Sequence, residues 1–142
     1  MRVVIDTNVI VSGLLFAGLP GQILDGVRAD RFDMCISEVL LSELQDVLSR
    51  AKFACRLEQT GLTVHDLVAS LRRLAIIVTA SEVPRIVTAD PADDHVLAAA
   101  VAANAGLIVT GDSDLLSLGN HMGVAIVTAR QALKLMADPK RR

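Results

Sequence analysis

Short apolar runs rich in β-branched residues alternate along this chain with longer stretches that have helical periodicity. The first, fourth and fifth of these runs contain no polar alternation, which is typical of strands in a parallel sheet that helices cover on both faces. The predicted strands are residues 3–5, 33–36, 75–79, 107–109 and 124–127. This order predicts an α/β fold, a three-layer α/β/α sandwich with a central, mainly parallel sheet.

The predicted helices lie at residues 10–29, 38–50 and 63–74 and after Pro91. The helix after Pro91 has the clearest limits, because Asp90 is a suitable N-cap and proline is favoured at the first helical position. Gly106 is expected to end this helix. Strand and helix signals thus alternate along almost the whole chain.

The length of 142 residues fits one domain, which we expect to span residues 1–137 before a polar tail at 138–142. Hydrophobic residues make up 52% of the chain and charged residues 21%, which excludes intrinsic disorder. The apolar runs fall far short of the roughly 20 residues that span a bilayer, and no signal-peptide core follows Met1. We therefore expect a soluble, cytoplasmic protein with no membrane partner.

The overall charge by itself suggests no partner. The formal net charge of −2 gives no polybasic footprint for nucleic acid or anionic lipid. Aromatic residues are limited to Phe16, Phe32 and Phe53, so the chain lacks rows of rings that stack on single-stranded nucleic acid. The chain is therefore not expected to bind single-stranded nucleic acid by stacking bases on aromatic rings.

The acidic residues that stand where apolar residues would be expected are Asp6, Glu43, Asp94 and Asp112. Asp6 and Asp112 follow the first and fourth strands, at the sheet edge where open α/β folds bind ligands. Asp94 shares a helix face with an apolar stripe that includes Leu97 and Val101, and Glu43 has a similar setting. The structural alternatives are a helix-dipole role for Asp94 and an ordinary helix-edge position for Glu43.

Carboxylates that lie close together need a positive charge to offset their burial and their mutual repulsion. An ionised carboxylate that is buried alone is strongly destabilised or shifts its pKa, and neighbouring carboxylates repel one another. A divalent cation removes both penalties, and oxygen ligands suit Mg²⁺ or Mn²⁺, whereas the isolated Cys35 and Cys55 give no zinc site. The pattern predicts metal-assisted hydrolysis of a phosphodiester by water, with one ion or two.

Other polar residues near these positions also have structural explanations. Capping and the helix dipole account for Asp90 and Asp93, although Asp93 lies at the same helix end as the predicted site. Asp114 fits equally a helix cap, a turn residue or a site acid. Asn8 and Thr110 are turn residues by default, but their positions allow them to orient a carboxylate, a water molecule or a phosphate.

Four blocks of sequence occur in the order of one known family. They are residues 4–9 (VIDTNV), 42–44 (SEL), 90–98 (DPADDHVLA) and 109–115 (VTGDSDL). Together they resemble a PIN domain, and more narrowly the VapC-like toxin subunits of bacterial toxin–antitoxin pairs. The resemblance extends from Val3 to about Ala137, and four blocks in order are specific where any single block is weak.

The resemblance maps the family's site acids to Asp6, Glu43, Asp94 and Asp112. It implies that Asp6, Asp94 and Asp112 bind Mg²⁺ or Mn²⁺ directly, and that Glu43 completes the site or acts through water. Asn8 or Thr110 would orient the scissile phosphate. Asp93 and Asp114 are supporting acids, and the spacing to Leu97 favours Asp94 over Asp93 as the ligand.

The activity that the resemblance implies is Mg²⁺- or Mn²⁺-dependent endoribonuclease cleavage of single-stranded RNA. The implied partners are a small antitoxin protein that blocks the site and a second copy of the chain in a homodimer. The basic residues available to position the RNA backbone are Arg28, Arg31, Arg50, Lys52 and Arg56, each of which also fits a solvated helix face.

Two alternative functions remain at this level. A haloacid-dehalogenase-like phosphatase would also place Asp6 after a first strand, but such enzymes need a second aspartate at position 8, where this chain has Asn8, and a lysine for which the chain offers no suitable candidate. A catalytically silent PIN-fold binding module is the second alternative. The clustered carboxylates argue against it, because a protein without a metal gains nothing evident from gathering them.

Overall fold

The computed structural model of the chain describes residues 1–80 and 91–137, and within them six strands form one sheet in the order β3-β2-β1-β4-β6-β5. The strands are β1 (Arg2–Ile5), β2 (Asp33–Ser37), β3 (Ile76–Val78), β4 (Leu107–Val109), β5 (Asn120–His121) and β6 (Val124–Val127). All neighbouring strands pair in parallel except β5 and β6. The predicted mainly parallel sheet is confirmed, and the short antiparallel β5 is an addition that the sequence did not predict.

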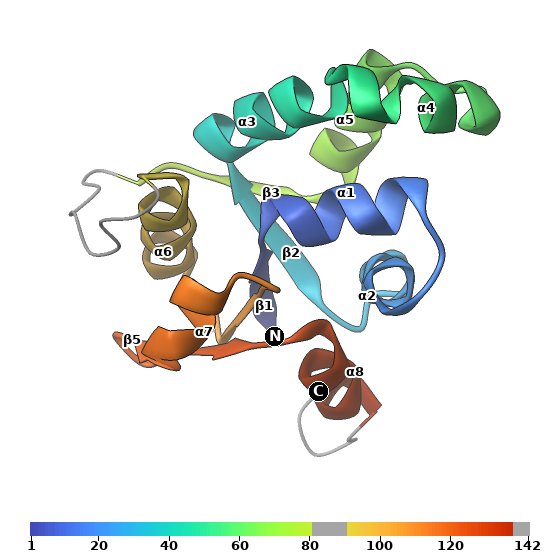
Figure 1. Ribbon diagram of the computed structural model, residues 1–142. Coiled ribbons are helices and arrows are strands. Elements are labelled where there is room, and N and C mark those ends of the chain that lie inside the picture. The colour runs from blue at the N-terminus through green and yellow to red at the C-terminus, as the bar shows by residue number, and fades with distance from the viewer. Residues whose placement is uncertain (81–90, 138–142) are drawn as a thin grey trace.

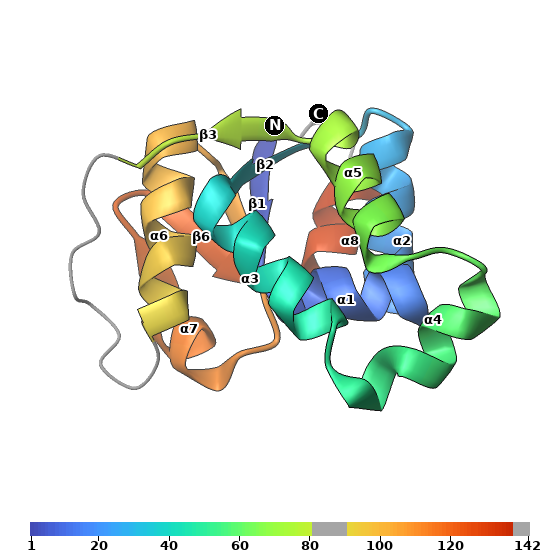
Figure 2. The same ribbon diagram turned by 90° about the horizontal axis from the view of Figure 1, so that it is seen from above.

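Helices cover both faces of this sheet. They are α1 (Thr7–Leu15), α2 (Leu19–Arg28), α3 (Glu38–Leu48), the 3₁₀ turn η1 (Ala51–Phe53), α4 (Ala54–Thr60), α5 (Val64–Leu74), α6 (Pro91–Ala103), α7 (Ser113–Leu118) and α8 (Ala129–Ala137). In Figure 1, α6 lies on one side of the strands and α2 and α8 lie on the other, while α1 and α3 lie toward the carboxyl ends of β1 and β2. Figure 2 shows the same layers from above, which confirms the predicted α/β/α sandwich.

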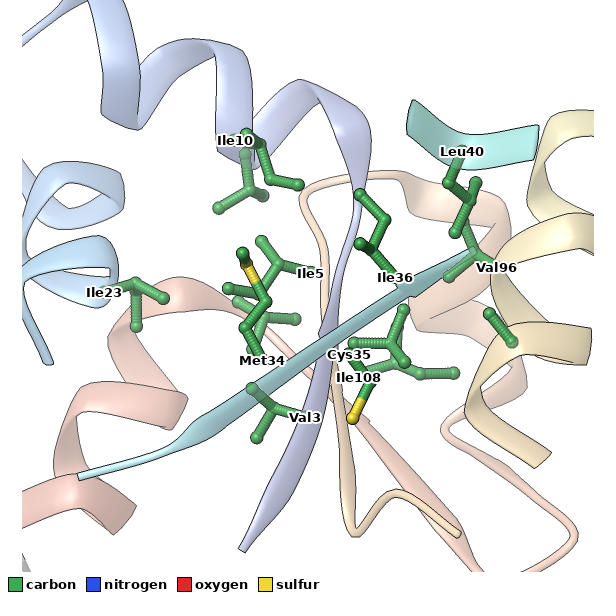
Figure 3. Close-up of a cluster of buried hydrophobic side chains, with 14 of the residues drawn as sticks. Val3, Ile5, Ile10, Ile23, Met34, Cys35, Ile36, Leu40, Val96 and Ile108 are labelled. Atoms are coloured by element: carbon green, nitrogen blue, oxygen red, sulfur yellow. The ribbon is translucent and has the colours of Figure 1, made fainter. Parts of the chain in front are cut away.

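Apolar side chains fill the space between the sheet and both helix layers. In Figure 3, Val3 and Met34 point toward α2, whereas Cys35 and Ile108 point toward α6 on the other face. All of these side chains are buried. The central strands are therefore covered on both sides, which is why their sequences show no polar alternation.

The predicted single helix at 10–29 is wrong, because the chain turns sharply between α1 and α2. Gly18 adopts a φ of 121°, a conformation that residues with a side chain rarely adopt, and Pro20 lies in the first turn of the next helix. The two helix axes are bent by 91°. No single helix within residues 1–80 and 91–137 is long and apolar enough to cross a membrane, and α1 with α2 meets that criterion only as this bent pair.

The helix after Pro91 is confirmed from its first residue, but Gly106 does not end it. Helix α6 ends at Ala103, followed by Asn104 in the left-handed conformation (φ 53°). The Ala105 amide donates to the Ala100 carbonyl (3.0 Å), which is the hydrogen bond of a Schellman cap. Asparagine therefore supplies the C-cap that we expected from glycine. The predicted N-cap Asp90 and the predicted tail at 138–142 lie outside the described residues.

Helices α1 and α2 pack closely at Gly13. A Cβ added there would lie 2.8 Å from the Pro20 carbonyl oxygen and 2.8 Å from Leu24 Cδ1, which is too close. We expect Gly13→Ala to lower the free energy of unfolding by about 1–3 kcal/mol, because the backbone of α2 must move to accommodate the methyl group. Urea unfolding measures this change.

Gly21→Ala is the matched control, because a Cβ at this helical position has no neighbour nearer than 3.7 Å. Alanine has the higher helix propensity, so this variant should be neutral or more stable than the parent. Equal stability of the two variants would contradict the close approach of the helices at Gly13.

Candidate metal centre

Asp6 lies buried where β1 passes into α1 at the carboxyl edge of the sheet. Its amide donates to the Val109 carbonyl of β4 (2.9 Å), and its own carbonyl accepts from the amides of Val9 and Ile10. Strand pairing and the first turn of α1 thus fix its backbone from both sides. The prediction that Asp6 directly follows the first strand is confirmed.

Thr110, which follows β4, connects Asp6 with the next acidic segment. Its hydroxyl donates to Asp6 Oδ2 (2.7 Å) and accepts from the Asp112 amide (3.0 Å), and its amide donates to the Val127 carbonyl (3.0 Å). The side chain is buried, so these hydrogen bonds are protected from water. Thr110 therefore holds two of the predicted site acids, and orienting a carboxylate is one of the roles that its position in the sequence allowed. Its role toward the phosphate stays a prediction.

Asp112 is the N-cap of α7. Its Oδ1 accepts hydrogen bonds from the amides of Asp114 (2.8 Å) and Leu115 (3.3 Å). Asp112 is half-buried and Asp114 is exposed. One carboxylate oxygen of Asp112 is thus held by the start of α7, and the helix brings Asp114 to the same side of the turn.

The carboxylates of Asp93, Asp112 and Asp114 form a cluster, in which one oxygen of each lies within 4.8 Å of the others. Asp93 comes from the first turn of α6 and is 3% exposed. Residues nearly twenty positions apart in the chain therefore meet at the carboxyl edge of the sheet. Among the described residues, these are the acids close enough to share one ion.

This cluster contains one of the four main predicted acids, Asp112, and the two that we predicted as supporting residues. Asp94 is buried beside Asp93 on α6, and Glu43 is half-buried on α3, but neither belongs to the group. Asp6 is linked to the group through Thr110. The role of each of these acids in metal binding stays a proposal.

The choice between Asp93 and Asp94 depended on which face of α6 is buried. The predicted stripe included Val101, yet Val101 is 38% exposed. Val96, Ala100 and Ala103 are buried, and they lie three, seven and ten positions after Asp93. Leu97 and Ala98 are buried as well, three and four positions after Asp94, so burial alone does not choose between the two acids.

The donor set of the cluster fits a hard divalent cation. Three carboxylates supply only oxygen, which suits Mg²⁺ or Mn²⁺, and their mutual repulsion is relieved when a cation lies between them. Burial raises the pKa of the Cys35 thiol, which disfavours its thiolate form. Cys55 is exposed and free. The arrangement can hold a cation and water beside an anionic substrate.

The basic residues proposed for RNA contacts differ in what surrounds them. Arg28 pairs with Asp25 (3.1 Å), and Arg56 donates to the Leu15 carbonyl while its guanidinium lies 5.0 Å from the centroid of the Phe16 ring. Arg31, Arg50 and Lys52 are exposed. Arg56 is thus held in place by α1 rather than fully available to a substrate.

Replacement of Thr110 by valine removes the hydroxyl that joins Asp6 to Asp112 and keeps the shape of the side chain. We expect Thr110→Val to weaken Mn²⁺ affinity by about 10–100-fold, the usual effect of losing a hydrogen-bond partner of a metal ligand. Calorimetric titration with Mn²⁺ measures it. Thr110→Ser restores the hydroxyl and should recover most of the affinity, whereas equal affinities of the valine and serine variants would argue against this positioning role.

Comparison with known proteins gives one match. A family model described as PIN domain matches residues 2–114. The matched segment runs from β1 to Asp114 and includes all three acids of the cluster. Neither the curated proteins nor the solved structures gave a match to the chain.

Proposed function

This chain belongs to the PIN domain family, whose members are typically metal-dependent nucleases, and we therefore propose that it is a Mg²⁺- or Mn²⁺-dependent endoribonuclease that cleaves single-stranded RNA. The observation that carries the proposal is the cluster of Asp93, Asp112 and Asp114 at the carboxyl edge of the sheet. Open α/β folds bind ligands at this edge. A hydrolase needs carboxylates gathered there, whereas a purely structural domain does not.

We assign the cation to the cluster of Asp93, Asp112 and Asp114, with Asp6, Asp94 and Glu43 as the surrounding acids that complete the site. The Thr110 hydroxyl holds Asp6 and Asp112 in position, because it donates to the Asp6 carboxylate and accepts from the Asp112 amide. Asn8 is exposed in the first turn of α1, where its amide is available to the substrate.

The chemistry that a bound Mg²⁺ or Mn²⁺ ion supplies is the activation of a water molecule and the stabilisation of charge on the phosphate. The carboxylates hold the cation and need not attack phosphorus themselves. A water oxygen bonds to phosphorus, the ester bond to the leaving oxygen breaks, and that oxygen takes up a proton, so the products are a phosphate monoester and an alcohol. The buried network around Thr110 fixes the acids before the substrate binds.

The deciding experiment incubates the purified protein with single-stranded RNA and Mn²⁺ or Mg²⁺, beside an Asp6→Asn variant prepared identically. We expect cleavage by the wild type, loss of cleavage with a chelator, and recovery when Mn²⁺ is restored. Equal cleavage by the variant would reveal a contaminating nuclease. Hydrolysis of small phosphate monoesters without RNA cleavage would favour the phosphatase alternative.

We further propose that the nuclease is the toxin of a toxin–antitoxin pair, acts in the cytoplasm and forms a homodimer. The support is the resemblance of the four motif blocks to VapC-like toxins. Expression of the wild type should arrest bacterial growth, while Asp6→Asn should not, and co-expression with the small protein of the neighbouring gene should relieve the arrest. Normal growth with accumulated active nuclease would exclude a toxin.

A further inference from the structure

A pocket of about 600 Å³ lies at the carboxyl edge of the sheet, next to the acid cluster but outside it. Its walls come from the N-terminal parts of α1, α2 and α8, three helices that lie close together in Figure 2, and from the turn after β4. The volume is within the range of about 300–1,000 Å³ that is usual for sites of small organic ligands. None of the proposed metal ligands lines it.

The pocket and the acid cluster share one turn of the chain. Thr110 and Gly111 line the pocket, and Asp112 is the next residue. Since consecutive Cα atoms are about 3.8 Å apart, this part of the pocket wall adjoins the backbone of one residue of the cluster. A polynucleotide whose phosphate is at the cluster can therefore extend past this turn toward the pocket.

The lining matches the chemistry of a nucleoside. Val9, Leu19 and Pro20 give it apolar walls that can cover the faces of a base. The amide of Asn8 and the hydroxyl of Ser12 both donate and accept hydrogen bonds, which is what the edge of a base requires. Because no aromatic ring lines the pocket, contacts to the base edge replace the stacking that most single-strand binders use.

Arg130 supplies a positive charge at the rim. It is exposed in the first turn of α8, and no ion pair engages it among the residues that the structure describes. A guanidinium in this position matches the phosphate that flanks a bound nucleoside. Arg130 thus lines the pocket as a positive group, whereas the acid cluster next to the turn of Thr110 and Gly111 is negative.

We propose that this pocket is a nucleoside subsite, which holds the RNA base adjacent to the cleaved phosphodiester while Arg130 binds the flanking phosphate. The proposal rests on the ribonuclease function proposed above. It makes Asn8, Ser12 and Arg130 determinants of where the RNA is cut. The metal-binding acids then perform the reaction without selecting the sequence.

The test measures binding of a fluorescein-labelled single-stranded RNA decamer by anisotropy at several salt concentrations, in Asp112→Asn protein that leaves the RNA intact. Arg130→Gln should weaken binding about tenfold and reduce the slope of log Kd against log salt by roughly 0.7, the value for one lost phosphate contact on a single strand. Lys134→Gln is the matched control, since Lys134 is exposed one turn later on α8 and does not line the pocket.

A second variant, Ser12→Leu in the otherwise wild-type protein, fills the pocket while all the site acids remain. We expect unchanged Mn²⁺ affinity but an altered set of cleavage positions on a mixed-sequence RNA. The subsite is refuted if Arg130→Gln binds RNA as well as Lys134→Gln does and Ser12→Leu keeps the wild-type cleavage positions. If the wild type still cleaves RNA in that case, the ribonuclease proposal stands. If the wild type neither binds nor cleaves RNA, both proposals fail.

Discussion

Replacement of Asp112 by asparagine is expected to reduce RNA cleavage by at least on the order of 100-fold, because loss of even an outer partner of a metal ligand typically costs about 10–100-fold. Asparagine is nearly isosteric and is as good an N-cap as aspartate, so it can still accept from the amides of Asp114 and Leu115. The substitution thus removes the charge while it preserves the start of α7. Single-turnover cleavage rates and calorimetric Mn²⁺ titration measure the two effects.

The control for Asp112→Asn is Asp25→Asn, which removes an exposed carboxylate from α2. Asp25 pairs with Arg28 on the surface, where such ion pairs contribute little to stability. The RNA cleavage rate and Mn²⁺ affinity of Asp25→Asn should therefore equal those of the wild type. Both variants should keep the thermal midpoint of the parent within a few degrees. Wild-type Mn²⁺ affinity in a folded Asp112→Asn protein would remove Asp112 from the metal site.

The second large effect is expected at Asp93. Asp93→Asn should weaken Mn²⁺ affinity and slow cleavage about as much as Asp112→Asn, because the Asp93 carboxylate is buried against the other two acids of the cluster. Asp94→Asn is the matched comparison, since it changes the adjacent residue, which is buried to a similar degree at 5% exposure. We expect the smaller loss of Mn²⁺ affinity from Asp94→Asn.

Measuring both variants by the same Mn²⁺ titration distinguishes the two assignments directly. A larger loss at Asp94 than at Asp93 would restore the ligand set of Asp6, Asp94 and Asp112 that the sequence favoured. It would also mean that the cluster of Asp93, Asp112 and Asp114 is not the cation site. Far-UV circular dichroism checks that α6 is intact in both proteins.

Much of the fold follows from local patterns in the sequence. The uninterrupted apolar runs of β1 and β4 predict buried parallel strands, because each face of such a strand lies under a helix layer. Proline at the first position of α6 predicts where that helix starts. These signals depend on residues within one turn or one strand, so they can be recognised without tertiary contacts.

The errors have a common physical cause. Apolar residues continue from α1 into α2, so their periodicity alone does not reveal the 91° bend at Gly18. The left-handed turn at Asn104 ends α6 before the glycine that was expected to do so. In both places the backbone turns at a residue with a positive φ, which the periodicity of apolar residues does not reveal.

The sequence by itself determined the alternating α/β architecture and the presence of acids at the ends of β1 and β4. It determined these because strand burial and the chain order of a parallel sheet are encoded in residue type and spacing. Only the tertiary structure decided which acids meet, since the rotation of α6 against the sheet brings Asp93 to Asp112 and Asp114. Because about 100° of rotation separates adjacent helical residues, the packing of α6 against the sheet decides which of Asp93 and Asp94 faces the other acids.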